Sequence, residues 1–305
     1  MPQHSDGARG DALSGYHPTV ALLYFICVLG LGTVLMHPVS LGISLACALG
    51  YALCLTGRRA VRLSVRFLLP MLAMTAVLSP IFNHQGGTIL AYLPGGNPLT
   101  LESIVYGGAA ALMLAGVILW FSCLNIVLTS DKLVFLFGRL APALSLIFSM
   151  TLRFVPRFKA QLAVITAAQR GLGRDVTAGT LRQRVRHGIT ILSIMVTWAL
   201  ESAVETADSM RARGFGLPGR TAFALYRFER RDAGALLYLA LCAGYVILGA
   251  VRGGLRFHYF PAVGGSLGGL YTVSLLCAHL ALGALPIILK VREDILWKKH
   301  SPSKT

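Results

Sequence analysis

The sequence has 305 residues, of which 55% are hydrophobic and only 13% are charged, and its mean hydropathy is +0.68. A soluble domain carries about 25% charged residues, so this composition excludes a disordered chain, a small secreted disulfide scaffold and an ordinary soluble enzyme. The net charge of +16 could suggest a nucleic-acid-binding domain, but such a domain would not need so much apolar sequence. We therefore expect no nucleic-acid partner. The composition predicts a protein that crosses a lipid bilayer several times.

Apolar segments long enough to cross a membrane occur in the first and last parts of the chain. A helix needs roughly 20 apolar residues to cross the bilayer core. The segments that approach this length are 19–36, 38–55, 67–82, 103–128, 234–251 and 267–289. We therefore predict an all-α, polytopic membrane protein with about six transmembrane helices.

The basic residues predict how these segments are oriented. If both termini are cytoplasmic, 26 of the 28 Lys and Arg residues lie on the cytoplasmic side, and residues 83–102 on the other side contain none. Cytoplasmic loops of membrane proteins carry the excess of Lys and Arg. The sequence thus predicts a multi-pass protein of a bacterial or archaeal cell membrane with both termini in the cytoplasm.

The region between the fourth and fifth predicted spans, residues 129–235, is too long for a loop and holds 16 of the basic residues. Its first helix is predicted to start at Ser130-Asp131, because an N-cap serine followed by an acid suits a helix N-terminus. Apolar residues then recur at helical spacing until Pro156, where the missing N–H is expected to break or kink the helix. Such a helix would lie on the membrane surface or under the spans.

Two more helices are predicted in this region. One runs from Pro156 to about Leu172, and the other from Thr180 to Arg213, where Gly214 and later glycines and a proline are stop signals. The apolar middle of the second helix, residues 188–200, has 13 residues, too few to cross a membrane alone. We expect a partly embedded helix with a charged cytoplasmic end. An extra membrane hairpin, made of 140–154 and 188–200, is the alternative and leaves the topology unchanged.

These elements divide the chain into three predicted regions. Residues 1–128 hold transmembrane helices 1–4, residues 129–235 form a cytoplasmic or interfacial helical layer, and residues 236–305 hold transmembrane helices 5–6 and a basic tail. The basic central layer is expected to bind a protein partner and the anionic membrane surface.

No pattern in the sequence indicates catalysis. It has no Walker A sequence, no His-Glu-x-x-His, no Gly-x-Ser-x-Gly and no Cys/His spacing typical of metal sites. The predicted spans contain almost no ionisable residues, which argues against a self-sufficient permease, and they lack the clustered polar residues of a membrane enzyme acting on lipid. We therefore expect no catalytic residue, cofactor or metal ion, and keep those two classes as alternatives to a membrane scaffold.

Several motifs resemble those of one transporter family. The most specific is Ala212-Arg213-Gly214, which follows Ala207-Asp208-Ser209-Met210-Arg211 and precedes Phe215-Gly216. With it, nearly the whole chain resembles the T component of energy-coupling factor (ECF) transporters, the EcfT/CbiQ family. Other segments similar to family patterns are Phe82-Asn83-His84, Asn97-Pro98-Leu99-Thr100, Ser130-Asp131-Lys132-Leu133 and Leu152-Arg153-Phe154-Val155-Pro156.

The resemblance implies a non-catalytic role. T components join a membrane-embedded, substrate-binding S component to two cytoplasmic ABC-type ATPases, which hydrolyse ATP to drive uptake of a vitamin or metal ion. Two long coupling helices end in Ala-Arg-Gly motifs whose arginines dock on the ATPases. Carried over, the docking residues are Ala212, Arg213 and Gly214 in the second motif, and Pro156 is a kink in a coupling helix.

The first of the two motifs departs from the family pattern. The local sequence is Ala168-Gln169-Arg170-Gly171-Leu172-Gly173. An ungapped alignment puts Gly171 and Leu172 at the alanine and arginine positions, whereas a shift of two residues makes Arg170 and Gly171 the docking pair. The sequence leaves both alignments open, and this asymmetry predicts that the two ATPase contacts are not equivalent.

Overall fold

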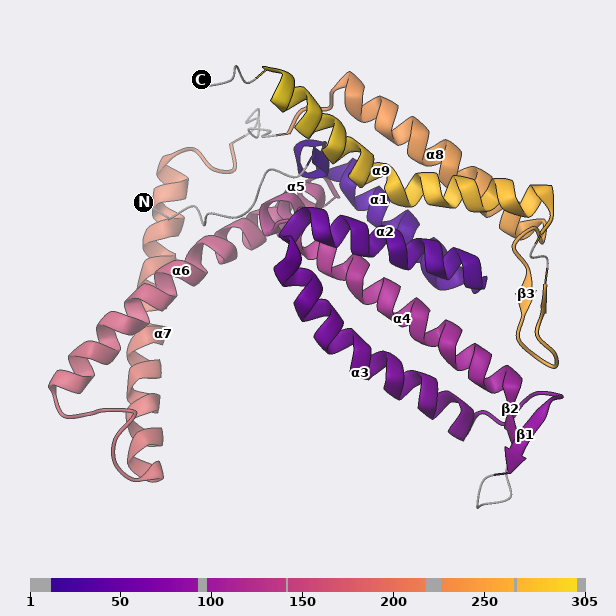
Figure 1. The fold of residues 1–305 in the computed structure, drawn as a ribbon. Coiled ribbons are helices and arrows are strands. Elements are labelled where there is room, and N and C mark those ends of the chain that lie inside the picture. The colour runs from indigo at the N-terminus through magenta and orange to yellow at the C-terminus, as the bar shows by residue number, and fades with distance from the viewer. Residues whose placement is uncertain (1–11, 93–97, 141, 218–225, 266–267, 301–305) are drawn as a thin grey trace, which may run out of the picture. The chain divides into compact units, whose positions relative to one another are not determined.

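The computed structural model describes residues 12–92, 98–140, 142–217, 226–265 and 268–300, and most of them are helical. Contacts divide the chain into two compact units. The first comprises Met1–Lys132 and Tyr226–Thr305, and the second Leu133–Leu225. The all-α, polytopic class predicted from the sequence is confirmed (Figure 1). The three-part functional division of the sequence stays a prediction.

The first unit is a helical bundle. Its elements are the short 3-10 helix η1 (Ala12–Gly15) and helices α1 (Pro18–Val34), α2 (Pro38–Thr56), α3 (Arg58–Phe82), α4 (Leu101–Val127), α8 (Arg230–Val251) and α9 (Leu270–His300). Helix α4 packs on α1, α2 and α3, α9 packs on α2 and α8, and α8 also contacts α1. The first two and last two helices of this unit are therefore neighbours although some 200 residues separate them (Figure 1).

Aromatic side chains form the centre of this bundle. Trp120 of α4 and Tyr24 of α1 are fully buried, with ring centroids 6.0 Å apart. The indole N–H of Trp120 donates to Ser44 Oγ of α2 at 3.1 Å, and the Tyr24 hydroxyl donates to the Gly283 carbonyl of α9 at 3.2 Å. A buried Trp or Tyr needs a partner for its polar atom. These two bonds therefore fix how α1, α2, α4 and α9 face one another.

Two short hairpins connect helices of this unit. Strands β1 (Ile89–Tyr92) and β2 (Pro98–Thr100) pair antiparallel between α3 and α4. Strands β3 (Phe257–His258) and β4 (Gly264–Gly265) pair between α8 and α9. The first hairpin is tied to α4, because the Glu102 carboxylate accepts a 2.8 Å hydrogen bond from the Thr88 hydroxyl.

Three helices carry the chain between the two parts of the bundle. They are α5 (Ser130–Leu140), whose first residues belong to the first unit, and α6 (Pro142–Gly171) and α7 (Leu181–Ala212) in the second. The predicted start at Ser130 is confirmed, and so is the predicted helix from Thr180 to Arg213, since these two residues are the N-cap and C-cap of α7. Thr180 and Gln183 form a capping box there.

The predicted helix break at Pro156 is wrong. Pro156 lies inside α6, which is continuous from Pro142 to Gly171. A single interior proline removes one hydrogen bond and bends a helix without ending it when the flanking turns stay bonded. The kink predicted at Pro156 stays a prediction.

Five helices among the described residues are long and apolar enough to cross a membrane: α2, α4, α7, α8 and the Leu270–Glu293 part of α9. The other two predicted spans correspond to α1, with 17 residues, and to the Leu68–Phe82 part of α3, which are shorter apolar helices. Helix α7 qualifies although the sequence predicts too short an apolar middle for it. Its mean hydropathy of 1.3 is the lowest of the five, because any 18-residue window around its middle includes Glu201 or Arg186.

Candidate functional site

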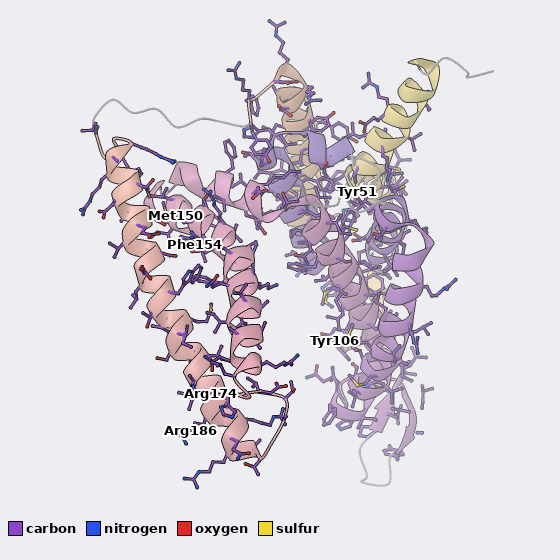
Figure 2. The ribbon with its side chains drawn as sticks, turned by 90° about the vertical axis from the view of Figure 1, so that its left-hand side faces the viewer. Tyr51, Tyr106, Met150, Phe154, Arg174 and Arg186 are labelled. Atoms are coloured by element: carbon purple, nitrogen blue, oxygen red, sulfur yellow. The ribbon has the colours of Figure 1, made fainter. Side chains whose placement is uncertain are left out.

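The predicted docking residues lie at the ends of the α6–α7 hairpin. The two helices run antiparallel, and the loop 172–180 joins them at the end where Arg174 and Arg186 lie (Figure 2). They touch at mid-length, where the rings of Phe158 and Trp198 are 5.4 Å apart, edge to face, and the Arg157 guanidinium lies 5.3 Å from the Trp198 ring centroid. A helix rises about 1.5 Å per residue, so the two C-terminal ends are roughly 45 Å apart.

Helix α7 ends in a Schellman motif. The Gly214 N–H donates to the Arg211 carbonyl at 2.9 Å, and the Phe215 N–H donates to the Met210 carbonyl at 3.0 Å. These are the two hydrogen bonds that define the motif, and they require a left-handed residue after the C-cap. Gly214 supplies it with a φ of +75°. Arg213 is therefore the C-cap residue, and its side chain is exposed just before the turn.

Helix α6 ends in the same motif. The Gly173 N–H donates to the Arg170 carbonyl at 3.0 Å, and the Arg174 N–H donates to the Gln169 carbonyl at 2.9 Å. The left-handed residue is Gly173, with a φ of +73°. The C-cap residue of α6 is therefore Leu172, whose side chain is 69% exposed.

The shared motif aligns the two helix ends residue by residue. Leu172 corresponds to Arg213 because both are C-cap residues, and each N–H also bonds to the carbonyl four residues earlier, at 3.3 and 3.2 Å. On either side, Gly171 corresponds to Ala212 and Gly173 to Gly214. Of the two alignments that the sequence leaves open, the cap geometry matches the ungapped one. Arg170 then corresponds to Arg211, two residues before the C-cap.

Arg170 is engaged by the loop that follows α6. Its Nε lies 3.1 Å from Asp175 Oδ2, and Nη2 lies 3.5 Å from Oδ1. The same carboxylate accepts hydrogen bonds from the Thr177 N–H and hydroxyl at 2.9 and 2.8 Å. These two bonds from Thr177, and then the charge of Arg170, lower the pKa of Asp175 below its usual 3.8. The α6 end thus carries a cation that already has an acidic partner.

The α7 end is different in charge. Among the described residues, no acidic side chain lies within ion-pair distance of Arg213, and Arg211 and Arg213 are both exposed at the negative end of the helix dipole. An exposed guanidinium offers two parallel N–H donors, which fit a carboxylate on another protein. Phe215, 47% exposed, follows directly. This end is suited to contact an acidic surface with an apolar pocket beside it.

The structure separates the predicted site residues into two groups. Ala212, Arg213 and Gly214 lie together at one end of the hairpin, and Arg170 and Gly171 at the other. Pro156 lies in α6, near neither end. The pairing of Arg170 with Asp175 is not among the sequence predictions, although Asp-x-Thr is a recognisable turn pattern in which the carboxylate accepts from the residue two positions later.

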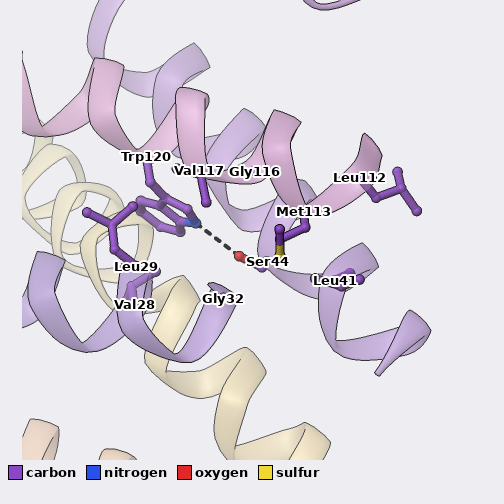
Figure 3. A pocket seen from close by; sticks show the side chains of 10 residues that line it. All are labelled: Val28, Leu29, Gly32, Leu41, Ser44, Leu112, Met113, Gly116, Val117 and Trp120. Carbon is purple, nitrogen blue, oxygen red and sulfur yellow. Dashed lines mark hydrogen bonds between the residues drawn. The ribbon is translucent and has the colours of Figure 1, made fainter. Parts of the chain in front are cut away.

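The described residues of the bundle offer little to a small ligand. Among them, no three His, Cys, Asp or Glu side chains gather as metal ligands would. A small pocket between α1, α2 and α4 has no room for even a water molecule, and Figure 3 shows Trp120 and Ser44 among the side chains that line it. Its lining has no charged side chain, and its two polar groups bond to each other. We assign it no ligand.

Comparison with known proteins places the chain in a family. Residues 11–223 match the family model of CbiQ, described as a cobalt transport protein. The energy-coupling factor transporter transmembrane protein EcfT of Listeria innocua is 28% identical over 186 residues, which cover 57% of this chain and 69% of the relative. EcfT of Bacillus selenitireducens is 29% identical over 201 residues (62% and 74%), and EcfT of Lacticaseibacillus paracasei is 35% identical over 100 residues (32% and 38%). Because the family model covers more than half of its length, this multi-pass membrane chain belongs to the CbiQ family.

Proposed function

We propose that this chain is the transmembrane coupling subunit of an ECF-type importer for a vitamin or metal ion. It joins a membrane-embedded S component, which binds the substrate, to two cytoplasmic ABC-type ATPases. The chain itself has no catalytic role, and ATP hydrolysis belongs to the ATPases. Family membership and the names of the EcfT relatives support this role.

The observation that carries the proposal is the pair of long helices α6 and α7 with matching capped ends. Each end presents a C-cap side chain and a turn glycine to solvent, roughly 45 Å from the other end. The two ends of one helical hairpin can thus contact two separate protein surfaces. Movement of the two ATPases relative to each other would change the angle between the helices or their positions, and so pass the motion to the membrane.

The docking site is formed by Ala212, Arg213 and Gly214 at the α7 end. Gly214 turns the chain out of the helix, so that the described residues after it, Phe215 to Leu217, do not continue along the helix axis over Arg213. Arg213 pairs with a carboxylate of the ATPase. At the α6 end the sequence offers Arg170 and Gly171, or Leu172 between two glycines, as the docking residues.

The orientation follows from the basic residues. Both termini and the α6–α7 ends face the cytoplasm, where the ATPases are, and the β1–β2 hairpin faces outward. This arrangement places the basic segment at the start of α3, with Arg62 and Arg66 exposed, on the cytoplasmic side.

Co-purification tests the proposed function. The chain is tagged, solubilised from the membranes of its host in mild detergent, and the ABC-type ATPases that accompany it are quantified by mass spectrometry. Arg213→Glu is expected to lower ATPase recovery and transport strongly, because it places a carboxylate against an acidic surface. Arg230→Glu, an exposed charge reversal at the start of α8, is the matched control and should change neither. No ATPase with the wild-type chain, or full recovery with Arg213→Glu, would contradict the role or the docking site respectively.

A further inference from the structure

We propose that the α6 end docks on its ATPase through the apolar side chain of Leu172, at the position where the α7 end uses the charge of Arg213. This inference rests on the proposed function, and it names the chemistry of the second docking surface. The partner is an ABC-type ATPase. Its surface is apolar where it contacts the α6 end, whereas the ATPase surface that contacts the α7 end is acidic.

The first support is the position of Leu172. Three backbone hydrogen bonds of the α6 end have counterparts at the α7 end, and the donor–acceptor distance in each matched pair differs by 0.1 Å. The left-handed glycines also match, with φ of +73° and +75°. Matching backbone geometry sends the side chains of Leu172 and Arg213 in the same direction from their helix ends. If the α6 end binds its ATPase in the same orientation as the α7 end, the ATPase surface therefore contacts Leu172.

The second support is the exposure of Leu172 and the lack of bulk around it. The side chain is 69% exposed, its neighbours in the chain are Gly171 and Gly173, and a Cβ added at either glycine would meet nothing within 4 Å. An exposed leucine between two glycines has nothing nearby in its own helix end to cover it. Burial in a partner's apolar pocket would remove its surface from water.

The third support is the state of Arg170. Its guanidinium is held by Asp175, which Thr177 fixes in place, so that docking through Arg170 would first have to break an ion pair with atoms 3.1 Å apart. Arg170 also corresponds to Arg211 and not to Arg213. The exposed Arg174, after the turn glycine of α6, corresponds to Phe215 of the α7 end. The α6 end therefore has its apolar side chain at the C-cap and its cation after the turn glycine, whereas the α7 end has the reverse order.

Variants at the two α6 positions test the inference in the whole complex. The ATPase subunits that accompany the wild-type chain are identified by mass spectrometry, and the same subunits are quantified in each variant complex after identical washes. Leu172→Asp and Leu172→Arg should lower the apparent affinity for ATPase by about tenfold or more, because each puts a charge into an apolar pocket. Leu172→Met and Arg170→Gln should retain the ATPase. Recovery of monodisperse chain from the membrane checks folding, which an exposed side chain is not expected to affect.

Each outcome has a defined meaning. Full retention with Leu172→Arg, or loss with Arg170→Gln, would overturn the inference and assign docking to the arginine. If Leu172→Arg retains the ATPase or Arg170→Gln loses it, while Arg213→Glu still releases it, the inference is overturned and the proposed function stands. If the wild-type chain recovers no ATPase, both are overturned. As a second measurement, a photo-crosslinking residue at position 172 should label an apolar ATPase peptide, and one at 213 an acidic one; the same peptide from both positions would contradict the inference.

Discussion

Leu172 and Arg213 occupy the same position of the same helix cap, at opposite ends of one hairpin. Each precedes a left-handed glycine, and each end is closed by the same pair of backbone hydrogen bonds. The backbone at the two ends is thus alike, while the side chains it presents differ in charge and polarity. Function at these ends is therefore expected to depend on two separable properties, the cap and the side chain on it.

The cap itself gives the first prediction. Gly214→Ala forces an L side chain into the left-handed region, which costs about 1–2 kcal/mol, and the new Cβ would lie 3.0 Å from Leu217 Cδ1. We expect the Phe215 amide, which closes the cap, to exchange its hydrogen about five- to thirtyfold faster. Hydrogen exchange of the peptide that contains Met210 and Phe215 measures this change.

The control for this prediction has the opposite sign. Gly171 lies in the helical part of α6, without a positive φ, and has open space around it. Gly171→Ala should therefore stabilise the α6 end by up to about 1 kcal/mol and slow exchange there. Equal behaviour of the two alanine variants would show that the left-handed cap does not hold the α7 end.

The second prediction concerns pH at the α6 end. Hydrogen bonds from Thr177, followed by the charge of Arg170, lower the pKa of Asp175 in the folded chain below 3.8. A carboxyl whose pKa falls on folding stabilises the fold above its unfolded pKa, and this stabilisation disappears as the pH falls through the folded pKa. The loop 172–180 should then be unaffected by pH near neutrality and loosen only below about pH 4.

Asp175→Asn provides the comparison. At pH 7 the loop of this variant should exchange its amide hydrogens faster than that of the wild type, because the ion pair with Arg170 is lost. As the pH falls below the folded pKa, the exchange rates of the two proteins should converge when compared at the same pH. A difference that persists at pH 2 would mean that the charge of Asp175 does not hold the loop.

Local signals in the sequence predict much of the α6–α7 hairpin. Thr180 and Gly214 predict where α7 begins and ends, because an N-cap threonine and a left-handed glycine after the C-cap act on neighbouring backbone groups. The sequence does not predict that α6 continues through Pro156, because a proline in sequence looks the same at a helix start and inside a helix. Only the position within the hydrogen-bonded helix decides whether a proline starts a helix or is accommodated inside it.

The alignment of the first docking motif could not be predicted for a similar reason. Gly171 and Gly173 are both plausible cap residues, and either choice gives a reasonable helix end. The positive φ falls on Gly173 alone, and this fact selects Leu172 as the C-cap. Likewise, contacts such as the bond from Tyr24 to Gly283 join residues that no local pattern connects.

The contact between the two coupling helices gives the third prediction. Trp198→Ala removes an aromatic pair with Phe158 and a cation–π contact with Arg157, which together are worth about 1–2 kcal/mol. We expect a lower midpoint of thermal unfolding in detergent and transport reduced more than ATPase binding, because both docking ends remain intact. Trp198→Phe keeps an aromatic ring and should lose less. Loss of ATPase binding equal to that of transport would argue against a coupling role for this contact.

The fourth prediction concerns membrane orientation. If the basic segments are cytoplasmic, the β1–β2 hairpin is outside and the start of α7 is inside. Tyr92 in β1 is 68% exposed and Leu181 at the start of α7 is 76% exposed, so each can be replaced by cysteine without disturbing buried contacts. A membrane-impermeant maleimide should label Tyr92→Cys in intact spheroplasts and Leu181→Cys only after permeabilisation, with the wild-type chain as the control for its own six cysteines. Labelling of Leu181→Cys from outside would contradict the predicted orientation, because it would place the α6–α7 loop on the side of the membrane away from the proposed ATPases.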